Sequence, residues 1–123
     1  MKVKIITNNP LIFSTYSNEY DVVYEKISYK KILNLVRDYI HKGHKLLTHP
    51  LSGSIKPNET PFKTILVSCV SNNLDIKSLS IIEQSIETAD KFTVLDKKYS
   101  KDIERDFMEI DLSLIENVIN RLY

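Results

Sequence analysis

The chain has 123 residues, which is enough for one domain with a single hydrophobic core but too few for two. Its 17 basic and 16 acidic residues leave a formal net charge of +1, which argues against nucleic acid as a partner because proteins that bind phosphate backbones are usually basic. No apolar run approaches the roughly 18 residues of a membrane span, and the N-terminus lacks the apolar core of a signal peptide. We therefore expect a single domain over residues 1–123, in the cytoplasm and without a membrane partner.

The first third of the chain predicts two strands, each followed by a helix. Residues 3–7 form a short run rich in β-branched side chains, which is typical of a buried strand. The sequence Asn8-Asn9-Pro10 then predicts the start of a short helix, with either asparagine as its cap. Residues 20–24 predict a second strand. A longer helix follows, with Ser28 as its cap and Gly43 as a left-handed terminator.

Three further segments have the composition of strands. Residues 45–48 predict a third strand, and residues 64–70 predict a fourth with a nearly continuous apolar run. Residues 92–95 predict a fifth strand at the edge of the sheet. The link between the third and fourth strands contains no clear helix, so the direction of the fourth strand stays open.

Helical periodicity returns twice in the second half. Residues 74–91 carry an apolar stripe behind two candidate caps, Asn73 and Asp75. The charged segment 100–107 predicts a short helix. A separate terminal helix is predicted behind Asp111, which is interpreted as its cap.

Alternating strands and helices predict an α/β fold, a three-layer sandwich around a mainly parallel sheet of four to five strands. The expected strand order is 2-1-3-4, which is flavodoxin-like or Rossmann-like. In such sheets ligands bind beyond the carboxyl ends of the strands where the order reverses, here between the first and third strands. The fold rule therefore points to the segments that begin at Thr7 and Thr48.

A long polar loop occupies residues 48–63 and contains three of the four prolines. Loops of this length in compact domains are often functional. Helix N-termini and loop donors favour anions, so we expect a small carboxylate or phosphate here. The alternative is that the asparagines only cap a helix and the serines only satisfy the loop backbone. The predicted ligand-binding residues are Thr7, Asn8, Asn9, Ser52, Gly53, Ser54, Lys56, Asn58 and Thr60.

His49 and Glu59 are the candidates for acid–base catalysis, with Lys56 as an electrostatic stabiliser. The alternative for His49 is a surface side chain that is hydrogen-bonded to the loop backbone. The sequence lacks both the G-x-G-x-x-G and the Walker A motifs, so no nucleotide cofactor is expected. No metal is expected either, since no cysteine or aspartate cluster accompanies the histidines. The single cysteine, Cys69, is interpreted as an inert core residue near the predicted site, and it fits a reducing compartment.

Two segments, ITNNPL within residues 5–11 and HKGHKLLTHPLSGSIKPNETPFK at residues 41–63, resemble the GrdX family. These are small proteins encoded in the glycine, sarcosine and betaine reductase operons of amino-acid-fermenting anaerobes. The resemblance implies an anaerobic cytoplasm and an association with selenium-dependent reductive deamination of glycine, but it assigns no reaction to particular residues. The residues of the resemblance are Asn8, Asn9, Pro10, His49, Pro50, Ser52, Gly53, Lys56, Pro57, Asn58, Glu59 and Thr60.

Three functional hypotheses follow. The first is an accessory protein of the reductase system that binds a small anionic molecule. The second is an enzyme that acts on such a molecule through His49 and Glu59. The third is an interaction module that docks to a reductase component, which predicts an exposed apolar patch around the loop. Oligomeric state stays open.

Overall fold

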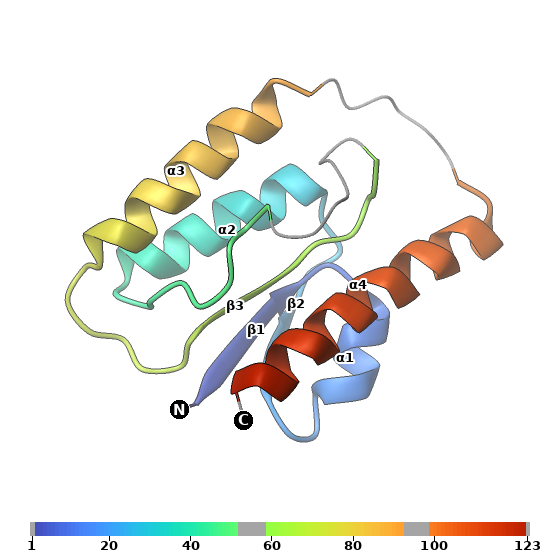
Figure 1. The fold of residues 1–123 in the computed structure, drawn as a ribbon, viewed down its shortest axis with the longest axis horizontal. Coiled ribbons are helices and arrows are strands. Elements are labelled where there is room, and N and C mark those ends of the chain that lie inside the picture. The colour runs from blue at the N-terminus through green and yellow to red at the C-terminus, as the bar shows by residue number, and fades with distance from the viewer. Residues whose placement is uncertain (1, 52–58, 93–98, 123) are drawn as a thin grey trace.

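The structure is a computed structural model in which residues 2–51, 59–92 and 99–122 are described (Figure 1). These parts of the chain form three strands and four helices. The strands are β1 (Val3–Thr7), β2 (Asp21–Tyr24) and β3 (Thr64–Ser68), and the helices are α1 (Pro10–Tyr16), α2 (Tyr29–His41), α3 (Ile76–Asp90) and α4 (Lys101–Leu122).

The sheet is mixed and has the order β2-β1-β3. β1 and β2 are parallel, with Ile5 opposite Val22, whereas β1 and β3 are antiparallel, with Thr7 opposite Thr64. The predicted fold class is therefore wrong. The described residues form neither a four- to five-stranded mainly parallel sheet nor the flavodoxin-like or Rossmann-like order.

The segment 45–48 is not one of the sheet's strands, although it lies beside β3. Its contacts with β3 include an antiparallel bridge between Leu46 and Val67, and a hydrogen bond of 2.9 Å from the amide of Leu47 to the carbonyl of Leu66. Val67 also pairs with Lys4 of β1, so the segment 45–48 must lie on the opposite edge of β3. Parallel strands need a crossover, usually a helix, whereas antiparallel segments can be joined by a loop. The loop at 48–63 thus joins two antiparallel neighbours.

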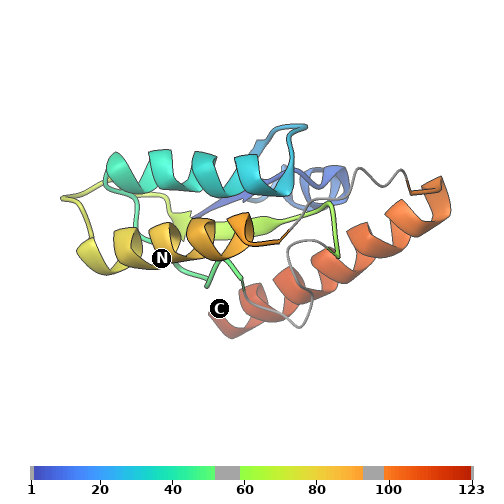
Figure 2. The same ribbon diagram turned by 90° about the horizontal axis from the view of Figure 1, so that it is seen from above.

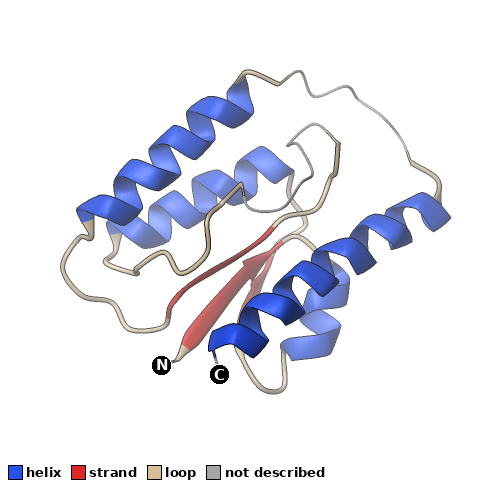
Figure 3. Cartoon of the chain, in the orientation of Figure 1, coloured by secondary structure: helices blue, strands red, loops and turns tan. Residues whose placement is uncertain are grey.

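Helices cover both faces of the sheet (Figures 2 and 3). α2 and α3 pack side by side on one face, where Ile6, Ile65 and Val67 point toward them. α1 and α4 pack on the other face, where Ile5 and Leu66 point toward them. Successive side chains of a strand alternate between faces, so each of the two central strands contributes to both cores.

The predicted helix signals at 28, 43 and 75 are confirmed. Ser28 Oγ accepts a hydrogen bond from the amide of Lys31, and Asp75 accepts one from the amide of Ser78. Gly43 has a φ of 103°, and a Cβ at this position would clash with the carbonyl oxygen of Asn72. Glycine is required here both for the left-handed backbone and for the close approach of the neighbouring chain.

The C-terminal region differs from its prediction. α4 is one helix of 22 residues rather than two helices, and Asp111 lies in its middle instead of capping its start. The predicted edge strand over 92–95 falls outside the described residues apart from Phe92. None of the described helices combines the length and the apolar character that crossing a membrane requires.

Candidate functional site at the end of the first strand

Asn8 joins three segments at the end of β1. Its side-chain nitrogen donates to the carbonyls of Ile27 at 2.9 Å and Pro61 at 2.8 Å, and its side-chain oxygen accepts from the amide of Lys63 at 2.8 Å. All of these partners are backbone groups. Asn8 therefore fixes the segment that leads into β3 against the end of β1, and both N–H donors of its side-chain amide are used in doing so.

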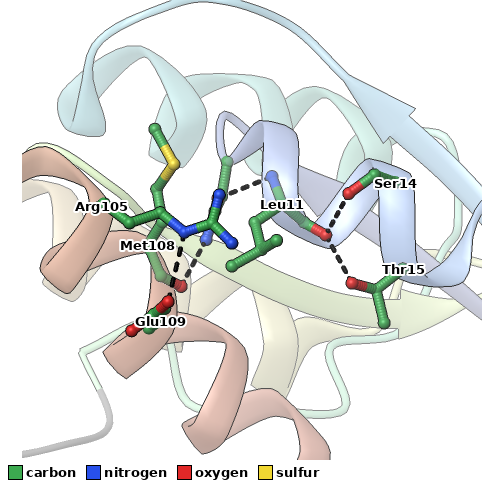
Figure 4. Close-up of polar contacts among 7 residues, drawn as sticks. Leu11, Ser14, Thr15, Arg105, Met108 and Glu109 are labelled. Carbon is green, nitrogen blue, oxygen red and sulfur yellow. Dashed lines mark hydrogen bonds and ion pairs between the residues drawn. The ribbon is translucent and has the colours of Figure 1, made fainter. Parts of the chain in front are cut away.

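Asn9 caps α1 and also binds α4. Its side-chain oxygen accepts from the amide of Leu11 at 3.0 Å, which is the cap that the sequence predicts. Its side-chain nitrogen donates to the carbonyl of Met108 and to Oδ2 of Asp111, both at 3.0 Å. Figure 4 shows this junction between the two helices, with Leu11 in the first turn of α1 close to Met108 of α4.

A chain of hydroxyl groups runs from β1 to α4. The amide of Asn9 donates to Thr7 Oγ1 at 2.9 Å, the hydroxyls of Thr7 and Thr64 are 2.7 Å apart, and Thr64 donates to Oδ2 of Asp111 at 2.6 Å. Because the one hydroxyl proton of Thr64 goes to Asp111, the hydroxyl of Thr7 must donate to Thr64. The chain therefore has a fixed direction that ends at the carboxyl group.

Asp111 is buried, with 8% of its surface exposed. Burial raises the pKa of its carboxyl group above the usual value, because the charged form loses its hydration. The hydrogen bonds from Thr64 and Asn9 and the positive charge of Lys63 oppose this rise. Asp111 is thus a carboxyl group whose protonation responds to what lies beside it.

Lys63 is the cation of this region and is 7% exposed. Its ammonium nitrogen lies 5.9 Å from the centre of the Tyr29 ring. Burial lowers the pKa of Lys63, and the nearby carboxylate of Asp111 acts in the opposite direction. Burial and Asp111 together raise the pKa of Tyr29 to about 12, so its hydroxyl stays protonated at neutral pH.

These side chains line a cavity of about 20 Å³, which is enough for a water-sized group. The cavity opens at the surface, since Ile110 and Leu114 are 44% and 38% exposed. Its lining combines four polar and four apolar side chains: Tyr29, Thr60, Lys63 and Asp111, with Phe62, Phe107, Ile110 and Leu114.

The structure gathers part of the predicted ligand site. Thr7, Asn8 and Asn9 lie together, and their side chains bind other parts of the protein. Thr60 lines the cavity, and its hydroxyl accepts from the amide of Phe62 at 3.2 Å. Five predicted ligand-binding residues lie outside the described residues: Ser52, Gly53, Ser54, Lys56 and Asn58.

The two predicted catalytic residues are both exposed. Nδ1 of His49 accepts a hydrogen bond of 3.1 Å from the amide of Leu51, which is the loop-backbone contact considered as its alternative role. His49 follows the segment beside β3, so β3 separates it from the end of β1. Acid–base catalysis by His49 and Glu59 stays a prediction.

Cys69 does not lie near this site. Because β3 is antiparallel to β1, the end of β3 meets the start of β1, and the amide of Cys69 donates to the carbonyl of Lys2. There the thiol lies 3.9 Å from Oδ2 of Asp21, beside a separate pocket of about 360 Å³. The prediction that Cys69 lies near the site is therefore wrong, because it holds only if this strand is parallel to β1. Within the described parts of the chain, no group of three or more His, Cys, Asp or Glu side chains could hold a metal ion.

Four residues of the candidate site were not predicted as site residues from the sequence: Tyr29, Lys63, Thr64 and Asp111. One pattern could have identified Asp111. It precedes Ile115 by four residues and Ile119 by eight, so helical spacing places its carboxyl group on the buried stripe of α4. A carboxylate in such a stripe predicts a buried polar contact.

Comparison with protein families agrees with the resemblance seen in the sequence. The model of the GrdX-like protein family matches residues 4–120, and the chain therefore belongs to this family. Searches of curated proteins and of solved structures gave no match.

Proposed function

We propose that this protein is a cytoplasmic accessory protein of the glycine, sarcosine and betaine reductase system, and that it binds a small anionic molecule beside Lys63. Membership of the GrdX-like family supports the association with that system. The observation that supports the ligand is Lys63 itself, a buried lysine on the wall of a cavity that Tyr29 and Thr60 also line. An ammonium group and two hydroxyls are suitable donors for a carboxylate or phosphate.

The size of the cavity restricts the ligand. A volume of about 20 Å³ admits only the charged end of a molecule, so the remainder must lie toward the opening at Ile110 and Leu114. Small carboxylic acids with a short apolar body meet both conditions. The lining does not favour a large polyanion, because half of it is apolar.

Asp111 makes the binding dependent on pH. A bound anion and the Asp111 carboxylate would compete for the charge of Lys63, and two anions close together raise the pKa of one of them. Binding should therefore be accompanied by proton uptake at Asp111. The affinity is expected to increase as the pH falls, because Asp111 is protonated more easily at lower pH and its raised pKa favours this protonation.

Thermal unfolding in the presence of glycine, sarcosine, betaine, acetate, acetyl phosphate and phosphate tests this proposal. A ligand that binds only the native state raises the midpoint with concentration. We expect a rise in the wild type and in Lys77→Gln, a matched control at an exposed lysine of α3, but none in Lys63→Gln. Circular dichroism checks that each variant folds. The absence of a rise with every compound, or an equal rise in Lys63→Gln, would contradict anion binding at this site.

A second candidate function is docking to a reductase component, and one observation favours it. Four apolar side chains follow each other along one side of α4 at spacings of four, three and four residues, beside the 59–63 segment. They are Ile103, Phe107, Ile110 and Leu114, of which all but Phe107 are exposed. An apolar stripe of this kind is typical of a helix that contacts another protein.

Ile103 separates the two functions because it does not line the cavity. Ile103→Glu should weaken co-purification with reductase components while leaving the ligand-induced thermal shift intact. Ile76→Glu is the matched control, since Ile76 is an exposed isoleucine at the start of α3. Equal co-purification of both variants and the wild type would argue against docking through α4.

A further inference from the structure

We propose that Lys63 is a carbonyl-reactive residue that forms a reversible imine with a small aldehyde or 2-oxo acid entering the cavity beside α4. This inference rests on the proposed use of the cavity as a ligand site, and it gives the ligand a chemical class. Three features of the site support it: the position of the Lys63 amine, the surroundings of that amine, and the neighbouring groups that can transfer protons.

The backbone of Lys63 is held rigidly. Its amide donates to Asn8 Oδ1 at 2.8 Å, its carbonyl accepts from the amide of Asn8 at 3.4 Å, and the next residue begins β3. The side chain therefore extends from a fixed point of the sheet toward the cavity. Reactive side chains that are mounted on such rigid elements keep their position better than side chains on loops.

Burial raises the fraction of Lys63 that is uncharged, whereas the nearby Asp111 carboxylate favours the ammonium form that binds an anion. Lys63 is 7% exposed, and Phe62 and Phe107 belong to the same cavity wall. The free electron pair of a neutral amine is the nucleophile in imine formation, and burial of a lysine increases the neutral fraction. The lowered pKa of Lys63 agrees with this effect.

Two neighbouring groups can handle the protons. The amine nitrogen would form a bond to the carbonyl carbon, and the carbonyl oxygen would take up a proton to give a carbinolamine. Loss of that oxygen as water, with transfer of the remaining amine proton, would give the imine. The balanced change is amine plus carbonyl to imine plus water, without oxidation or reduction. Asp111 and Tyr29 line the same cavity as Lys63, so the Asp111 carboxyl group, whose pKa is raised by burial, and the Tyr29 hydroxyl are the candidates to exchange these protons.

The test is reductive trapping of the full-length protein with glyoxylate and cyanoborohydride at pH 7, followed by peptide mapping by mass spectrometry. Exposed lysines such as Lys77 serve as the internal control within the same sample. Because burial lowers the pKa of Lys63 and so raises the neutral fraction of its amine, we expect carboxymethylation to be several-fold faster at Lys63 than at Lys77. In Lys63→Arg, the labelling of Lys77 should be unchanged.

Labelling of Lys63 at the same rate as Lys77, or more slowly, would overturn the imine. Acetate distinguishes this failure from a failure of the proposed function, because it carries the anionic group without an aldehyde. A thermal shift by acetate that depends on Lys63, without selective labelling by glyoxylate, would leave anion binding in place and reject the imine. Selective labelling without any acetate shift would support the imine and reject simple anion binding.

Discussion

The helices on the two faces of the sheet are attached to it by different interactions. α2 contacts the sheet and α3 through apolar side chains, including the fully buried Ile32, Leu33, Val36 and Ile40. α4 has two buried isoleucines, Ile115 and Ile119, but it also carries the buried carboxyl group of Asp111, which binds Asn9 of the β1–α1 junction and Thr64 of β3.

Because of this difference, we expect the two faces of the sheet to respond differently to protons and ligands. Burial of apolar surface is insensitive to protonation, so the α2 and α3 face should behave as a constant scaffold. The contact of α4 with the sheet includes a titratable carboxyl group and lies beside the candidate ligand site. A ligand or a proton that reaches Asp111 should therefore change the attachment of α4 and leave the opposite face unchanged.

The largest expected effect is on the apolar face. Leu33→Ala removes a fully buried side chain and should lower the free energy of unfolding by about 2–5 kcal/mol, from the lost burial and the cavity that remains. Urea unfolding measures it, with Asn34→Ala as the exposed neighbouring control. If the comparison is right, the cost of Leu33→Ala is the same at pH 5 and pH 8. A strongly pH-dependent cost would contradict the view of this face as a constant scaffold.

The next effect is on the polar attachment of α4. Asp111→Ala leaves the side-chain amide of Asn9 and the hydroxyl of Thr64 without their shared acceptor, which should cost about 1–3 kcal/mol. Asp111→Asn keeps an acceptor oxygen of similar shape and should cost less. Urea unfolding of both variants measures the difference. Buried charged groups can sometimes be replaced without loss of stability. If Asp111→Ala is as stable as the wild type, the network around Asp111 positions α4 without stabilising the fold.

The pH dependence of stability tests the same carboxyl group. Its pKa in the folded state is raised above the ordinary value of 3.8, so the folded state binds the proton more tightly than the unfolded state. The stability that this group contributes is therefore present at low pH and is lost as the pH rises through its folded pKa. Relative to Asp111→Asn, which keeps Lys63 and cannot titrate here, the wild type should lose stability as the pH is raised from about 4 to neutrality. A constant difference between the two curves would show that Asp111 does not titrate in this range.

The local features of the fold could be predicted from the sequence. Each of these features depends on residues that lie close together in the chain. They are β1, the caps of α1, α2 and α3, and the left-handed Gly43. The direction of β3 could not be predicted in the same way, because it depends on pairing with β1 across some sixty residues of chain. The sequence of residues 48–63 predicts no clear helix, which leaves the direction of the following strand open, since a parallel pair needs a crossover and an antiparallel pair can be joined by a loop.

The candidate site shows the same division. Asn8 and Asn9 could be predicted because an asparagine pair before a proline marks a helix start. Lys63 and Asp111 could not be identified by position, since one follows a loop and the other lies in a charged helix. Only the fold brings them to one cavity, where burial changes the chemistry of both. The chemistry of these two residues depends on their tertiary environment, which cannot be predicted from composition.

The smallest expected effect compares the two helix caps. Within the part of the chain that the structure describes, the side chain of Ser28 has only the role of capping α2. Ser28→Ala should therefore lower the free energy of unfolding by about 1 kcal/mol, the usual value for a lost cap. Asn9 caps α1 and also donates to Met108 and Asp111, so Asn9→Ala should cost more. Ser28→Asp restores the cap and serves as the control. Equal costs for Ser28→Ala and Asn9→Ala would mean that the contacts of Asn9 with α4 add no stability. In that case the attachment of α4 would depend on its apolar side chains and on the hydrogen bond from Thr64 to Asp111.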